Sequence, residues 1–359
     1  MKNALRSATG LGLAAVMVST NATAVDVEID GIIDVFAGSV EPIGEDTDST
    51  TVLNSGGRDT SYWGIQASDA ITSDLTAVGD VEAFFRPDVA ESGRFDGDKF
   101  FARSAKLGLQ GDFGSVYGGR ITAPLYLPML FTNPFGGSFT FSPANFHTYA
   151  GNGDAAASYL GDSGWDNSIQ YVAPTMGGVT ATAQYAFGET EGESGEDRLG
   201  GNLVYRSGGT VMIAGAQYLD LGTVGGLNYS AGGEHSSAIL GVSQSIGGAQ
   251  LFGQYQYADY DLDEDLNGNE SFDINTGTAG VSLPAGPGSV LAAVAYSDAT
   301  RLTTDVDFEE GGNRTTFAVG YDMSVGSAVN LYATYFHDDV DEPGLDAGKT
   351  LAAGMQYRF

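Results

Sequence analysis

The sequence contains no cysteine, which excludes disulfide bonds and thiolate metal sites. Basic residues are few, with 15 Lys and Arg against 46 Asp and Glu in 359 residues. Nucleic-acid binding requires basic patches, so this balance argues against a nucleic-acid partner. After residue 24, no stretch approaches the roughly 20 consecutive apolar residues of a membrane-spanning helix. We therefore expect no disulfide framework, no nucleic-acid-binding face and no helical membrane anchor.

Residues 1–24 have the pattern of a secretory signal peptide. Two basic residues precede the short apolar run Leu11–Val18, and Ala22–Ala24 fits an A-x-A cleavage motif. The apolar run is too short to cross a bilayer as a helix. We expect export across the inner membrane and cleavage after residue 24, which leaves residues 25–359 as a single domain.

The stretch 349–359 alternates strictly between two kinds of side chain. One face carries Leu351, Ala353, Met355, Tyr357 and Phe359, and the other face carries polar or small residues. This alternation predicts a strand with one apolar and one polar face. An edge strand of a soluble domain is the alternative. A lipid-facing barrel strand accounts better for the aromatic end, because barrels place aromatic residues at the membrane interface.

The same alternation recurs along the chain, and Ile213 and Leu251 are expected at the centre of the lipid face. Short turns alternate with long acidic connections, as in outer-membrane barrels with periplasmic turns and extracellular loops. An even number of strands can close without a free edge. The fold class predicted is all-β, a 16-stranded antiparallel transmembrane β-barrel. The expected strands are 25–37, 62–70, 75–86, 100–111, 114–121, 166–175, 178–188, 198–206, 209–220, 236–246, 249–259, 272–283, 288–299, 313–324, 327–338 and 349–359.

Three stretches carry a family resemblance, namely the hairpins 63–82 and 103–120 and the segment 166–178. They contain Trp-Gly-Ile-Gln with Leu-Thr-Ala, Phe-Gly with Gly-Gly-Arg, and Asp-Asn-Ser-Ile-Gln-Tyr, respectively. Their order and spacing resemble those of the Gram-negative general porins, particularly the trimeric 16-stranded type of Neisseria and Burkholderia relatives. The resemblance implies a homotrimer in the bacterial outer membrane. It also implies lipopolysaccharide-containing lipid and the barrel assembly machinery as partners, small hydrophilic solutes and ions as cargo, and no cofactor.

The alternation stops over about 122–164. A structureless stretch of this length in a compact fold is usually functional. In the family that this chain resembles, loop 3 lies at this place, folds into the barrel and narrows it. Irregular backbone at membrane depth is tolerated where it lines a cavity. We expect residues 122–164 to be this constriction loop, with an ordinary extracellular loop as the alternative.

Members of the family place basic side chains on the wall opposite loop 3, and the matching positions here are Gln66, Arg103 and Gln170. Two of the three have therefore lost their charge. Strand alternation leaves open whether a bulge turns Arg103 inward or whether Lys106 is the lumenal cation. The candidate constriction residues are Gln66, Asp80, Glu82, Arg86, Arg103, Lys106, Arg120 and Gln170.

Two further features receive a prediction. Tyr357 and Phe359 end the final strand and, by the resemblance, are expected to act as the signal for the assembly machinery. Asp263, Asp265 and Asn267 copy the first half of an EF-hand loop, but its twelfth position is Ile274 and not the bidentate Glu that calcium requires. We therefore expect a solvated acidic loop and no metal site.

An enzyme is not expected. The three histidines, His147, His235 and His337, each fall in a loop or at a strand end, without a carboxylate and hydroxyl in register. The predicted function is passive diffusion of small hydrophilic solutes and ions through a water-filled channel, with a weak preference for cations. The alternatives are a substrate-specific porin with a solute-binding ladder and, more distantly, a surface adhesin or a barrel enzyme.

Overall fold

The computed structural model describes residues 25–150, 161–189, 197–220, 233–262, 272–298, 313–341 and 344–359. The predicted signal peptide, residues 1–24, lies outside the described residues. The acidic residues Asp263, Asp265 and Asn267 also lie outside them.

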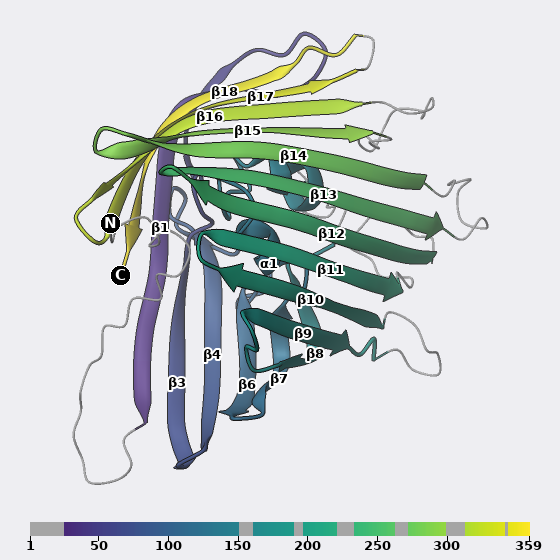
Figure 1. The fold of residues 1–359 in the computed structure, drawn as a ribbon. Coiled ribbons are helices and arrows are strands. Elements are labelled where there is room, and N and C mark those ends of the chain that lie inside the picture. Colours follow the sequence, from purple (N-terminus) through teal and green to yellow (C-terminus); the bar gives the residue numbers. More distant parts are fainter. Residues whose placement is uncertain are drawn as a thin grey trace.

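In the described part of the chain, sixteen antiparallel strands form a closed barrel (Figure 1), as predicted. β1 pairs with the last strand over Ile32–Glu41, and this pairing closes the sheet. The wall consists of β1 (Asp26–Glu41), β3 (Tyr62–Thr72), β4 (Leu75–Arg86), β6 (Ser104–Gly111), β7 (Gly114–Thr122), β8 (Gly164–Val172), β9 (Val179–Ala186), β10 (Arg198–Ser207), β11 (Thr210–Asp220), β12 (Gly233–Ile246), β13 (Ala249–Leu262), β14 (Phe272–Ala285), β15 (Gly288–Asp298), β16 (Arg314–Val325), β17 (Val329–Val340) and β18 (Gly348–Arg358).

Two short strands were missed by the sequence pattern, β2 (Thr50–Ser55) and β5 (Glu91–Ser92). β2 pairs with the upper part of β1, and β3 pairs with its lower part over Asp26–Ile32. Together β2 and β3 accompany β1 as one interrupted strand, and residues 56–61 form the break. The surrounding acidic and glycine residues concealed β2. In addition, β6 begins at Ser104 and not at residue 100.

The outer face follows the predicted alternation. Leu107, Leu199, Leu240 and Leu251 are between 43 and 70% exposed. The placement of Ile213 on this face is wrong, because Ile213 is 3% exposed and packs inside the barrel with Leu125 and Met129. β11 is apolar on both sides at this point, so alternation alone does not tell which side faces lipid.

The segment between β7 and β8, called loop 3 below, has residues 123–150 and 161–163 described. It contains α1 (Tyr126–Leu130), α2 (Pro143–Asn145) and the π-helical turn η1 (Phe146–Ala150). None of the described helices has the length and apolar composition needed to cross a membrane. α1 lies inside the curve of the sheet (Figure 1) and contributes Met129 to a buried cluster with Ile213, Ile239 and Tyr260.

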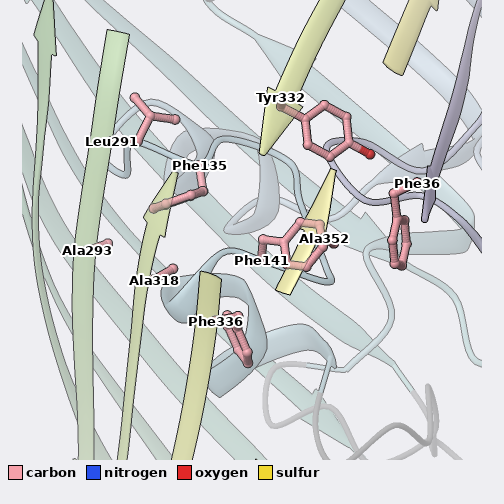
Figure 2. Close-up of a cluster of buried hydrophobic side chains, with 9 residues drawn as sticks. All are labelled: Phe36, Phe135, Phe141, Leu291, Ala293, Ala318, Tyr332, Phe336 and Ala352. Carbon is pink, nitrogen blue, oxygen red and sulfur yellow. The ribbon is translucent and has the colours of Figure 1, made fainter. Parts of the chain in front are cut away.

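A second cluster holds the next part of loop 3 (Figure 2). Phe135 and Phe141 pack against Leu291, Tyr332 and Phe336 on β15 and β17. We call the inner face of β10–β18 the loop-bearing wall, because most strand residues of both clusters lie on it; Phe36 of β1 joins the second cluster. The described part of loop 3 thus packs against the inner face of these strands.

Candidate functional site

The inner face of β1, β3, β4 and β6, called the charged wall below, carries two rows of side chains across the sheet. Strand register places Glu28, Gln66, Asp80 and Lys106 in one row. The second row is Asp30, Gly64, Glu82 and Ser104. Alternation along each strand directs these positions to the same face. Four carboxylates and one lysine are therefore brought together on one surface.

Gly64 allows two of the carboxylates to approach each other. A Cβ at this position would lie 2.8 Å from Cγ of Glu82 and 3.5 Å from Oδ1 of Asp30. A side chain here would therefore have to displace Glu82. The glycine keeps Asp30 and Glu82 as neighbours across β3.

Arg103 and Lys106 both reach this wall, although the sequence left open which of them faces the lumen. Arg103 lies one residue before β6, so alternation within the strand does not govern its direction. Its guanidinium forms an ion pair with Glu82 and stacks over the ring of Tyr62 at 3.8 Å. Lys106 forms an ion pair with Asp80 at 2.8 Å. Each cation is thus already matched by a carboxylate.

The two glutamines at the positions of lost family cations lie on separate strands. Nε2 of Gln66 donates to Asp30 at 3.4 Å. Nε2 of Gln170 donates to Oε1 of Gln184 on β9 at 2.9 Å. Three strands, β4, β6 and β7, lie between them, so the structure does not bring the two glutamines together. The hydrogen-bond partner of Gln170, Gln184, is polar but neutral.

Two more predicted residues, Arg86 and Arg120, pair mainly with carboxylates in the connections between strands, and Arg120 also pairs with Asp166 on β8 at 2.8 Å. Arg86 pairs with Glu91 at 2.6 Å and with Asp96 at 2.5 Å, both in the connection after β4. The buried Arg120 pairs with Asp162 at 2.6 Å, at the end of loop 3. These two arginines therefore hold connecting segments. Within the described residues, neither forms an ion pair with the row of Glu28, Gln66, Asp80 and Lys106.

Asp162 links those connections. Arg94, in the connection between β4 and β6, contacts it at 2.8 Å, and Arg120 contacts it from β7. Burial acts to raise the pKa of Asp162, but the two arginines outweigh it and lower the pKa to about 2. The carboxylate therefore stays charged and holds the end of loop 3 to its neighbours over the physiological pH range.

The break at residues 56–61 is anchored by a residue that the sequence analysis missed. The carboxylate of Asp34, which is fully buried, accepts the backbone N–H groups of Gly57, Arg58 and Asp59 at 2.9, 3.1 and 3.2 Å. It also accepts the hydroxyl of Tyr332 at 2.6 Å. Two features of the sequence could have indicated this anchor: an acidic residue inside the apolar part of β1, and the Gly56-Gly57 pair.

From this anchor, the 56–61 break holds loop 3. Nη1 of Arg58 donates to the carbonyl of Phe135 at 2.5 Å, and its Nε pairs with Asp322 at 2.8 Å. The hydroxyl of Ser138 donates to the carbonyl of Gly57 at 2.6 Å. Loop 3 is thereby tied to β2, β3 and β16 through polar contacts.

A second polar anchor lies on the loop-bearing wall. Arg314 and Asp338 form a bidentate pair, with N–O distances of 2.8 and 2.7 Å and almost no solvent exposure. The hydroxyl of Thr316 donates to Asp338, and the ring of His147 lies between Ser297 and Thr316, 2.6 Å from each hydroxyl. This network fastens η1 to β15, β16 and β17.

The expectation that no histidine lies in register with a hydroxyl and a carboxylate is therefore wrong for His147, which contacts two hydroxyls and is connected to Asp338 through Thr316. The sequence could not reveal this set, because Ser297, Thr316 and Asp338 come from three different strands. His147 and Ser297 are both 0% exposed, so a substrate has no route to them. Burial lowers the pKa of His147 to about 3, which keeps the ring neutral. The set is a structural anchor.

Comparisons with known proteins agree with this architecture. The family model of Gram-negative porins matches residues 11–343. No curated protein sequence matches the chain. Among solved structures, the anion-selective porin of Comamonas acidovorans is similar, with a TM-score of 0.74 and 20% identity over 94% of this chain and 100% of that one.

Two further solved structures share the fold. OmpT of Vibrio cholerae in its trimer form has a TM-score of 0.66 and 17% identity, covering 94% of this chain and 100% of that one. OmpF of Salmonella typhi has a TM-score of 0.60 and 14% identity, covering 93 and 98%. Family and fold together indicate a channel and not an enzyme. The chain belongs to the Gram-negative porin family, whose barrels span the bacterial outer membrane.

Proposed function

We propose that this porin is a general diffusion channel for small hydrophilic solutes and ions, with a weak to moderate preference for cations. The observation that carries the cation preference is the pairing of the basic side chains. Arg103 and Lys106 are matched by Glu82 and Asp80, while Asp30 and Glu28 on the same wall form no ion pair within the described part of the chain. An excess of negative charge along a narrow aqueous path favours cations.

The positions of lost family cations support the same proposal. Gln66 and Gln170 stand where the resemblance leads us to expect basic residues, and neither side chain carries charge. The similar Comamonas porin is described as anion-selective, but at 20% identity it is informative about the fold alone. Selectivity therefore has to be argued from this chain's own lining residues.

Solute swelling assays in liposomes test the general-channel proposal. A general porin admits uncharged sugars according to size, whereas a substrate-specific porin with a binding ladder admits them according to identity. An adhesin or a barrel enzyme admits none. Rates that fall smoothly with solute size would support the proposal, and a large rate for one sugar among others of equal size would contradict it.

We propose a homotrimer in lipopolysaccharide-containing outer membrane, assembled by the barrel assembly machinery. The trimer form in which the similar OmpT of Vibrio cholerae was solved supports the trimer. The rings of Tyr357 and Phe359 are stacked at 6.0 Å and about two-fifths exposed, as expected for residues at a lipid interface that the machinery recognises. Deleting Phe359 should leave the protein in the periplasm, because its backbone also pairs with Gly31 to close the barrel. A normal yield of trimer in the membrane would contradict this role.

A further inference from the structure

Asp30 differs in its partners from Glu82, the other carboxylate of the second row. It accepts the hydroxyl of Tyr62 at 3.1 Å and Nε2 of Gln66 at 3.4 Å, and both donors are neutral. Glu82, its neighbour across Gly64, has Arg103. Within the described part of the chain, Asp30 therefore has no cation among its partners.

Arg103 is prevented from serving both carboxylates. Its guanidinium stacks over the Tyr62 ring at 3.8 Å and is paired with Glu82. The Tyr62 hydroxyl is in turn directed to Asp30. The single positive charge of Arg103 thus lies near two carboxylates, Glu82 and Asp30. It pairs with Glu82, and Tyr62 contacts both the guanidinium and Asp30.

Gln66 occupies the place from which a cation could balance Asp30. Its amide reaches Asp30 but carries no charge. We propose that Asp30 is the specificity-determining residue of the cation preference, and that a neutral side chain at position 66 keeps its charge uncompensated. This inference rests on the proposed channel function and assigns its selectivity to one carboxylate.

Asp30 is a better candidate than the other unpaired carboxylate, Glu28. Asp30 is 8% exposed and fixed by two hydrogen bonds, so its charge is screened less than that of a mobile side chain in water. Glu28 lies two residues further toward the start of β1 and is more exposed. Even in a water-like dielectric, a unit charge about 8 Å from a permeating ion changes the ion's occupancy by about twofold.

The test is the reversal potential of single channels across a salt gradient, for the wild type and Asp30→Asn. Asp112→Asn is the matched control, because it removes the same charge from an exposed turn between β6 and β7. We expect the cation-to-anion permeability ratio to fall at least about twofold in Asp30→Asn, with little change in Asp112→Asn. Equal ratios for the wild type and Asp30→Asn would overturn the inference.

Gln66→Arg provides a second route that leaves Asp30 in place. The arginine would pair with Asp30 and should lower the ratio as much as Asp30→Asn does, so it decides the matter if Asp30→Asn does not assemble. An unchanged ratio in Gln66→Arg would also overturn the inference. A wild type without cation preference would contradict the proposed selectivity itself, and a wild type without conductance would contradict the channel.

Discussion

The charged wall and the loop-bearing wall line the same barrel but present different surfaces to its interior. The loop-bearing wall carries apolar residues such as Ile239, Leu291 and Phe336, and loop 3 packs directly on them. The charged wall carries four carboxylates, of which only Glu82 and Asp80 are matched by a cation, and neither of its two rows belongs to these clusters. We infer from this difference that the inward faces of the strands decide where loop 3 lies. Loop 3 packs where these faces are apolar, because the contact removes apolar surface from water.

The largest contrast is expected when one cation is removed from each wall. Arg314→Met should destabilise the barrel by about 3–5 kcal/mol, because Asp338 is left buried without its cation and keeps only the Thr316 hydroxyl as a donor. Lys106→Met should cost about 1 kcal/mol or less, because that pair is partly solvated. Urea unfolding of the two variants in lipid vesicles measures both. Equal losses would show that loop 3 does not seal the loop-bearing wall.

The outer faces of the two walls should respond alike. Leu107 on β6 and Leu240 on β12 are 70 and 60% exposed toward lipid. Replacing either by lysine should cost about 2–4 kcal/mol in the membrane, where the charge meets hydrocarbon. Leu251→Lys is the depth control and should cost less, because the prediction that Leu251 lies at the centre of the lipid face is wrong: Leu251 is the third residue of β13, close to the turn at Gly247 and Gly248. A neutral effect at both Leu107 and Leu240 would refute the lipid-facing assignment.

Acid should weaken the loop-bearing wall through His147. Its pKa in the folded protein is lowered to about 3 by burial, against an ordinary value of 6.5, so below pH 6.5 the unfolded chain binds a proton that the folded one does not. The free energy of unfolding should therefore fall as the pH decreases from 6.5 toward 3, by about 1 kcal/mol for the first pH unit. Unfolding at pH 7 and 5 should differ less in His147→Gln, and an equal difference in both proteins would contradict the role of His147.

A smaller, electrical effect is expected when the two lost cations of the lining are restored. The double variant Gln66→Arg, Gln170→Arg should shift the wild type's cation preference toward anions. The wild-type preference should be stronger in dilute salt, because the Debye length grows from about 8 Å at 0.15 M to about 30 Å at 0.01 M. Reversal potentials at both salt concentrations measure this. A wild type that already prefers chloride, with no change in the double variant, would place the constriction elsewhere.

Strand alternation and turns were sufficient to predict the sixteen wall strands, because each strand meets lipid on one face and a different medium on the other. They failed for Ile213, because loop 3 makes the inner medium apolar there as well. Arg103 could not be oriented, since it precedes its strand. The role of Asp34 could not be predicted, because its contacts with Arg58 and Tyr332 join residues far apart in the sequence. No local sequence pattern shows which backbone N–H groups lack a partner where a strand is interrupted.

We expect the aqueous path to run between loop 3 and the charged wall. The natural absence of cysteine allows a direct test with single cysteines at Gln66 on the charged wall and at Ala318, which is 0% exposed in the cluster with Phe135. A cationic, thiol-specific methanethiosulfonate reagent should react with Gln66→Cys and reduce single-channel current, and should leave Ala318→Cys unmodified. Rapid modification of Ala318→Cys with block of the current, and no reaction at Gln66→Cys, would contradict the claim.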